Sequence, residues 1–328
     1  MNVHPLWNQY PSLKKELEQT LTLMATSINL ANKEVETAIL DMINSGGKLL
    51  RPAYLLLFSQ FGKKRELNKM MALAASMETL HTATLIHDDI VDEADTRRNL
   101  PTVQSTFGKD VAVYAGDYLF VSCFKLVAKY ASSLKSVQLN VDSMEKVLNG
   151  ELGQMNQRYN YEVTVDDYLT NISGKTAELF SLSCFLGAFE SGAPTLVSKS
   201  AKDIGFNIGM AFQILDDILD YSQSEATIGK PVLEDMKQGV YSLPLLCALE
   251  THQEALIPLL EKKHAMTDSD TQTVYTIIQE ADAVEKARHL AQSYTEKALT
   301  SINKLPKNNE QTKEILSQLT LSLLKRSQ

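Results

Sequence analysis

The sequence predicts an all-α protein. Three observations support this fold class: apolar residues recur at helical spacing, no segment sustains an alternation of period two, and several of the nine prolines fall at the edges of helical segments. The first stripe follows spacings of four, four, three and four, with Leu13, Leu17, Leu21, Met24 and Ile28. We expect helices at residues 12–31, 34–44, 52–61, 66–93, 106–131, 136–160, 166–191, 195–223, 240–262, 268–280 and 281–303.

The helical period also runs through the segment that ends near residue 88. Its stripe comprises Leu67, Met70, Leu73, Met77, Leu80 and Thr84. Prolines then separate the elements along the chain, because proline is tolerated at the start of a helix but not in its interior. The prolines at expected element edges are Pro52, Pro101, Pro194, Pro231 and Pro306.

Composition favours one large domain that does not bind nucleic acid. A length of 328 residues alone suggests about two domains, but no linker rich in Pro, Gly or Ser divides the chain. We therefore expect a single domain over residues 1–328, and a hydrophobic content of 44% is ample for its core. The net charge of −8 and the lack of a basic stripe argue against nucleic-acid binding, which depends on clustered Lys and Arg.

The cysteines and the first residues indicate a cytoplasmic protein. Cys123, Cys184 and Cys247 are odd in number and set in apolar surroundings, which favours buried reduced thiols over disulfides or a zinc site. Residues 1–12 lack the basic start and apolar core of a signal peptide. No stretch reaches the roughly 18 apolar residues of a membrane span, so we expect no integral membrane segment.

Two acidic motifs of the form D-D-x-x-D each follow a long apolar helical stretch. The first acidic motif contains Asp88, Asp89 and Asp92, and the second contains Asp216, Asp217 and Asp220. On a helix these positions lie within roughly 100° of one another, so three carboxylates point into the same space. Near a helix C-terminus the dipole disfavours them, so they need a cation. One copy alone could be a solvated acidic turn, but two copies indicate Mg²⁺ that bridges carboxylates to a diphosphate.

Basic and polar residues accompany both motifs. His81 precedes Asp88 by two helical turns on nearly the same face, and Gln213 precedes Asp216 by about one turn. Several of these residues also have a simpler explanation when each is taken alone. An arginine pair can lie in a solvated loop, a basic residue can favour the end of a helix, and a histidine can be buried in the core with its hydrogen bonds satisfied. The candidates are Lys48, Arg51, His81, Arg97, Arg98, Lys175, Thr176, Gln213 and Lys230.

The ordered set of motifs resembles the trans-polyprenyl diphosphate synthase family. The resemblance covers residues from about 40 to 250 and rests on GGKLLRP at 46–52, HTATLIHDDIVDEADTRR at 81–98, PTV followed by FG at 101–108, GDYLF at 116–120, GELGQ at 150–154, GKTAELF at 174–180, FQILDDILD at 212–220 and GKPVLEDMKQG at 229–239. It implies a single large helical bundle of the isoprenoid synthase type with a central active-site cavity.

The resemblance also implies the reaction, a Mg²⁺-dependent head-to-tail condensation of isopentenyl diphosphate with an allylic diphosphate. Metal ions and basic residues would neutralise the leaving diphosphate, the isopentenyl double bond would attack the carbocation, and the released diphosphate would take the proton. The implied metal ligands are Asp88, Asp89, Asp92, Asp216, Asp217 and Asp220. The implied allylic diphosphate ligands are Arg97, Lys175 and Lys230, and those of isopentenyl diphosphate are Lys48, Arg51, His81 and Arg98. Thr176 and Gln213 would stabilise the carbocation through their dipoles.

The chain departs from the family pattern at four places. Leu49-Leu50 replaces a pair that often contains a basic residue, and Asn99 stands where Gly commonly follows the arginine pair. Gln104 stands where His is common, and Val240 occupies a frequent Lys position. The last departure removes a charge near the second acidic motif.

Two small residues indicate a long product. Ala83 and Thr84 lie five and four positions before Asp88. Family members that make products with short prenyl chains carry aromatic residues at these positions. Each helical turn covers about 5.4 Å, roughly one isoprene unit, so small residues leave room for a hexaprenyl to heptaprenyl chain or longer. The alternative is that Ala83 is small only for helix packing, with a geranylgeranyl or farnesyl product.

Two further alternatives are a class I terpene cyclase and a non-catalytic regulatory subunit of a heteromeric synthase. A cyclase generally has a different second metal motif and does not need a second diphosphate site. Regulatory subunits usually lose the aspartates, and this chain keeps all six. The resemblance also implies a dimer, formed with a second copy or with a small, dissimilar activating subunit.

Overall fold

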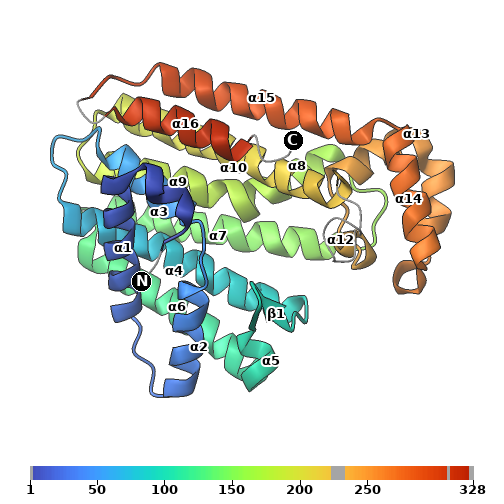
Figure 1. The fold of residues 1–328 in the computed structure, drawn as a ribbon, viewed down its shortest axis with the longest axis horizontal. Coiled ribbons are helices and arrows are strands. Elements are labelled where there is room, and N and C mark those ends of the chain that lie inside the picture. The colour runs from blue at the N-terminus through green and yellow to red at the C-terminus, as the bar shows by residue number, and fades with distance from the viewer. Residues whose placement is uncertain (1–2, 223–232, 309–310, 325–328) are drawn as a thin grey trace. The chain divides into compact units, whose positions relative to one another are not determined.

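The computed structural model describes residues 3–222, 233–308 and 311–324, and it confirms the all-α fold class (Figure 1). The α-helices are α1 (Pro11–Thr26), α2 (Lys33–Asn44), α3 (Leu50–Ser59), α4 (Leu67–Val91), α5 (Val103–Phe107), α6 (Lys109–Tyr130), α7 (Leu134–Asn156), α8 (Val165–Ile172), α9 (Glu178–Glu190), α10 (Thr195–Ser222), α12 (Glu234–Lys237), α13 (Leu243–Leu260), α14 (Asp268–Glu280), α15 (Ala283–Asn303) and α16 (Thr312–Leu324). Short 3-10 helices cover Pro5–Gln9 and Lys263–Ala265, a π-helical turn covers Ser173–Ala177, and the two-residue strands are β1 (Thr96–Arg97) and β2 (Leu100–Pro101).

Two expected helices differ from the observed elements, and a further helix was observed where none was expected. The helix expected at 106–131 is preceded by a separate short helix, because Gly108 has a φ of 91° and interrupts the regular backbone between α5 and α6. The helix expected at 166–191 is interrupted by the π-helical turn between α8 and α9. The sequence prediction also missed α16, whose range had not been assigned to any element.

The chain groups into two compact units. The first unit comprises Met1–Val141, Leu182–Lys202 and Asn308–Thr312, and the second comprises Asp142–Ser181, Asp203–Lys307 and Lys313–Gln328. The first acidic motif belongs to the first unit and the second acidic motif to the second unit. A single domain over the whole chain stays a prediction.

In the first unit, α4 is the central helix. It packs against α1, α3 and α6, and α4 and α6 run side by side (Figure 1). Every residue of α3 except Arg51 is buried, and α9 approaches this helix so closely that a Cβ on Gly187 would lie 2.1 Å from the Leu55 carbonyl oxygen. This packing holds α4 on several sides, so its C-terminal end presents the first acidic motif from a fixed support.

In the second unit, α13 packs against α8, α14 and α15. The last turns of α10 join this core through Ile214 and Ile218, which are fully buried. Asp216 and Asp220 each follow one of these isoleucines by two residues and are exposed, because they fall on the opposite face of the helix. The core thus orients Asp216 and Asp220 of the second acidic motif toward solvent.

Helix α6 contains an apolar stretch longer than the sequence analysis recognised. By length and composition it is apolar enough to cross a membrane, with 44% of its most apolar window buried. The partial burial arises because one face of α6 packs on α4 in the first unit. Val113, Tyr114 and Val121 lie on its exposed part, with exposed fractions of 39%, 76% and 50%.

The three cysteines are free and buried, as the sequence predicts.

Candidate active site

The first acidic motif lies at the end of α4. The amide of Asp92 donates a hydrogen bond to the carbonyl oxygen of Asp88 at 2.8 Å, so helical geometry continues through the motif. Asp88 and Asp92 are therefore one turn apart on the same face. Asp88 is half-buried and Asp92 is exposed. Two carboxylates so placed are hard oxygen donors of the kind that bind divalent cations together with phosphate oxygens.

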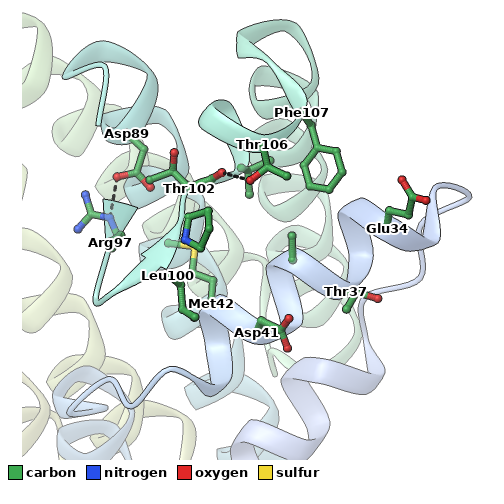
Figure 2. A pocket seen from close by; sticks show the side chains of 13 residues that line it. Glu34, Thr37, Asp41, Met42, Asp89, Arg97, Leu100, Thr102, Thr106 and Phe107 are labelled. Carbon is green, nitrogen blue, oxygen red and sulfur yellow. Dashed lines mark hydrogen bonds and ion pairs between the residues drawn. The ribbon is translucent and has the colours of Figure 1, made fainter. Parts of the chain in front are cut away.

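Asp89 has a different environment from the other two carboxylates of the motif. Only 3% of Asp89 is exposed, and its Oδ1 accepts a hydrogen bond of 2.7 Å from Nε of Arg97. Burial raises the pKa of Asp89, and the Arg97 guanidinium opposes this shift. Figure 2 shows the two side chains pointing toward each other at one end of a pocket of about 250 Å³. The ion pair fastens the β1–β2 hairpin to α4 and brings Arg97 next to the first acidic motif.

The hairpin explains the departure at Asn99. Arg97 pairs with Leu100 across the antiparallel strands, so Arg98 and Asn99 form a two-residue turn with φ angles of 51° and 63°. Both residues have the left-handed backbone conformation that a type I′ turn requires, and Asn adopts this conformation more readily than most residues other than Gly. Gln104 has a local partner too, because its Nε2 donates to the Ala94 carbonyl at 2.8 Å. These two departures preserve the loop that follows the motif.

A cationic cluster lies beside the earlier turns of α4. Burial lowers the pKa of His81 well below its usual range, and the nearby guanidinium groups of Arg51, Arg98 and Arg97 lower it further. Burial also lowers the pKa of Arg51 to about 10, while the carboxylate of Glu78 opposes that shift. His81 is consequently neutral near pH 7, with the guanidinium groups of these arginines near it.

Glu78 is a member of this cluster that the sequence prediction missed. Burial raises its pKa, and Arg51 and Arg98 oppose the shift. Its position three residues before His81, on the same face of α4, is the signal that could have identified it. The guanidinium of Arg98 also contacts Gly47, where a Cβ would lie 3.0 Å from Nη1.

Lys48 is held by the start of the chain. The indole Nε1 of Trp7, which is fully buried, donates a hydrogen bond of 2.9 Å to the Lys48 carbonyl oxygen. The following Leu49 has a φ of 53°, and both Leu49 and Leu50 are buried. An apolar pair therefore fits this position, where a basic side chain would lose solvation.

The two residues proposed to set product length also lie on α4. Ala83 is fully buried, and Thr84 is half-buried with its hydroxyl donating to the His81 carbonyl at 2.8 Å. Their roles stay predictions.

The second acidic motif contains a carboxylate with two donors. Asp217 accepts hydrogen bonds from Gln213 Nε2 at 2.8 Å and from the Tyr168 hydroxyl at 2.6 Å. The Thr176 hydroxyl in turn donates to Gln213 Oε1 at 2.6 Å. Thr176, Gln213 and Asp217 thus form a continuous chain of hydrogen bonds. Tyr168 is a residue that the sequence prediction missed.

The other carboxylates of this motif crowd one another. Partial desolvation of the Asp220 carboxyl, together with the carboxylates of Asp235 and Asp216, raises its pKa to about 6. Burial raises the pKa of Asp217 to about 7, against the hydrogen bonds from Tyr168 and Gln213. The carboxylates of Asp216 and Asp235 contribute to both shifts after burial, and a bound cation would relieve this repulsion.

Lys175 lies in the π-helical turn. Its ammonium is 2.9 Å from Glu151 Oε2 and donates to Gln154 Oε1 at 2.9 Å. Lys230 lies outside the described residues. Within the residues described, no group of three or more His, Cys, Asp or Glu side chains is arranged to hold a metal ion. That the two acidic motifs serve one metal site stays a prediction.

Known proteins identify the family of this chain. The model of the polyprenyl synthetase family matches residues 32–280. The chain belongs to the polyprenyl synthetase family. It is 33% identical over 300 residues to heptaprenyl diphosphate synthase component 2 of Bacillus subtilis (strain 168), covering 90% of this chain and 82% of that protein.

Solved structures of other synthases resemble the chain over nearly its full length. The geranylgeranyl pyrophosphate synthase of Lactobacillus brevis ATCC 367 is 44% identical with a TM-score of 0.94, covering 98% of this chain and 99% of that chain. A polyprenyl synthase from Caulobacter crescentus CB15, complexed with calcium and isoprenyl diphosphate, is 28% identical with a TM-score of 0.87 and covers 97% of both chains. This polyprenyl synthetase has the all-α isoprenoid synthase fold, is a prenyltransferase and belongs to a family that depends on divalent metal ions. The products named for its relatives differ in length.

Proposed function

We propose that this prenyltransferase condenses isopentenyl diphosphate head-to-tail with an allylic diphosphate, using Mg²⁺, and makes an all-trans product of hexaprenyl to heptaprenyl length or longer. The observation that carries the proposal is the cationic cluster of Arg51, Arg98 and His81, in which His81 lies two helical turns before Asp88 on α4. Elongation needs two diphosphate sites and cyclisation needs one. The cluster therefore favours a synthase over a terpene cyclase.

The side chains of this enzyme would act by binding charge and excluding water. His81 is neutral, so it can donate one hydrogen bond to the isopentenyl diphosphate while Lys48, Arg51 and Arg98 supply the positive charge. Arg97, Lys175 and Lys230 would hold the allylic diphosphate.

Charge on the leaving group must be neutralised for ionisation to occur. Mg²⁺ fits the oxygen donors of Asp88 and Asp92 and, when bound, would neutralise charge that develops on the diphosphate. Thr176 and Gln213, fixed to each other by a hydrogen bond of 2.6 Å, offer dipoles that stabilise a carbocation without capturing it. Water must be excluded, because it would trap the cation.

The direct test is to incubate the purified protein with Mg²⁺, isopentenyl diphosphate and a series of labelled allylic primers, and then to size the products. We expect elongation to a ladder that ends at the hexaprenyl to heptaprenyl range or above. Products that stop at geranylgeranyl would overturn the long-chain assignment and leave the reaction class intact. Cyclic hydrocarbons or no consumption of isopentenyl diphosphate would overturn the reaction itself.

Ala83→Phe is expected to shorten the product without abolishing turnover. The ring would block a tunnel along α4 about one turn from Asp88, while the ionising residues remain in place. Overpacking at a fully buried position can also cost about 1–3 kcal/mol, so unfolding should be measured beside product length. Thr84→Phe should act similarly. Folded variants of both kinds that keep the wild-type product distribution would show that the tunnel does not follow this face.

We further propose a dimer, with a second copy slightly favoured over a small activating subunit. The exposed stripe of α6, formed by Val113, Tyr114 and Val121, is the surface that such a partner would cover. Light scattering should give twice the mass of the chain, and Val121→Glu should give a monomer. Leu196→Glu, at an equally apolar exposed site on α10, is the matched control.

The outcomes separate the two forms of the partner proposal. An active monomer would refute both, whereas an inactive homodimer rescued by cell extract would favour the activating subunit. The cytoplasm remains the expected compartment.

A further inference from the structure

The GELGQ segment of α7, residues 150–154, packs directly on the π-helical turn that carries Lys175. A Cβ on Gly150 would lie 2.6 Å from the backbone nitrogen of Lys175, and a Cβ on Gly153 would lie 2.5 Å from Oδ1 of Asn171. From the other side, a Cβ on Gly174 would lie 2.5 Å from the Lys146 carbonyl oxygen. At Gly150 and Gly174 the Cβ would meet backbone atoms, so no larger residue fits there and the backbone of Lys175 is fixed against α7.

The two polar residues of the same segment hold the Lys175 side chain. Glu151 Oε2 and Gln154 Oε1 are each 2.9 Å from the Lys175 ammonium. They lie three residues apart and so share one face of α7. Only 14% of the Glu151 side chain and 29% of the Lys175 side chain are exposed. A π-helical turn is rare within helices and is frequent at functional sites, which makes the placement of this lysine specific.

The contacts with Glu151 and Gln154 reduce the conformational entropy that the Lys175 side chain would lose when a diphosphate binds. Its ammonium sits on a long flexible stem, so an isolated lysine loses conformational entropy whenever it is ordered by a ligand. A fixed carboxylate and a fixed amide order the stem beforehand.

We propose that Glu151 is a positioning residue that orders the Lys175 ammonium for the allylic diphosphate, with Gln154 as the neutral second support. This rests on the proposed function, because it takes the allylic diphosphate to be the ligand of Lys175. Glu151 does not contact the substrate in this proposal and acts only through Lys175. Its removal should therefore impair use of the allylic substrate and leave the use of isopentenyl diphosphate unchanged.

The test is a double-mutant cycle between Glu151 and Lys175. We expect Glu151→Ala to lower kcat/KM for the allylic primer about tenfold or more, Glu151→Gln to lower it less because an acceptor oxygen remains, and the KM for isopentenyl diphosphate to stay constant. In the Lys175→Met background, Glu151→Ala should have no further effect, because its role depends on the ammonium. Glu145→Gln, an exposed acid on the same helix, is the matched control.

Each outcome supports or overturns the proposal. Additive losses from Glu151→Ala and Lys175→Met, or equal losses for both substrates, would show a general structural role and overturn it. If Glu151→Ala does not fold, the same double-mutant cycle with Glu151→Gln in its place tests whether the role of Glu151 depends on Lys175. A wild-type protein that does not elongate primers would reject the proposed function, whereas an active wild type with an impaired Lys175→Met and an unaffected Glu151→Ala rejects only the role of Glu151.

Discussion

Replacing Asp88 or Asp216 by alanine is expected to lower turnover at least about 10²-fold, which is the usual cost of deleting one key electrostatic stabiliser. Each substitution removes a carboxylate at the place where charge develops on the leaving diphosphate. Both side chains are accessible on their helices, so the helical fold should remain. Product formation at saturating Mg²⁺ measures the loss, and far-ultraviolet circular dichroism verifies the fold.

The matched control for this experiment is Asp203→Ala. Asp203 is exposed on α10, the helix that carries Asp216, but it lies outside both acidic motifs. Its replacement should leave turnover at the wild-type level. Near-normal rates in Asp88→Ala and Asp216→Ala would mean that the acidic motifs are not the metal site.

Removing the cation of a buried ion pair should give the largest loss of stability. Glu190 at the end of α9 has a fully buried carboxylate, 2.5 Å from the Lys69 ammonium on α4. It also accepts hydrogen bonds from the amide of Ser132 at 3.0 Å and from the hydroxyls of Ser132 and Ser136. Lys69→Met leaves this carboxylate buried without its cation. We expect the free energy of unfolding to fall by about 3–5 kcal/mol.

Urea denaturation followed by circular dichroism measures this change. Lys14→Met is the control, because it breaks an exposed pair in which 36% of Lys14 and 40% of Glu18 are accessible. Its expected effect is below about 1 kcal/mol. Equal losses in the two variants would contradict the predicted contribution of the buried pair.

The effect of Lys69→Met should depend on pH. Burial raises the pKa of Glu190, but hydrogen bonds from Lys69, Ser132 and Ser136 outweigh burial and hold the pKa below its usual range. A carboxyl with a lowered pKa in the folded state stabilises the protein above its unfolded pKa of about 4.3, and this contribution is lost as the pH falls through the folded pKa. The difference between wild type and Lys69→Met should therefore shrink on acidification.

The local geometry of the motifs could be predicted because it depends on residues close in sequence. A helix places Asp88 and Asp92 one turn apart whatever surrounds it. The hydrogen bond from the Asp92 amide to the Asp88 carbonyl oxygen confirms this spacing. The contacts of Asp89 could not be predicted in this way. Its partner Arg97 reaches it only because Arg98 and Asn99 adopt left-handed conformations and fold the hairpin back onto α4.

The sequence by itself determined the all-α class, the positions of most helices and, through the order of its motifs, the family. Only the tertiary structure decided which side chains meet: Glu78 with the arginines, Tyr168 with Asp217, and Glu151 with Lys175. The physical reason is that a helical period specifies which face a residue occupies, because spacing along one helix is set by its own backbone. The neighbour across that face depends on how separate helices pack, which the summed burial of many distant residues decides.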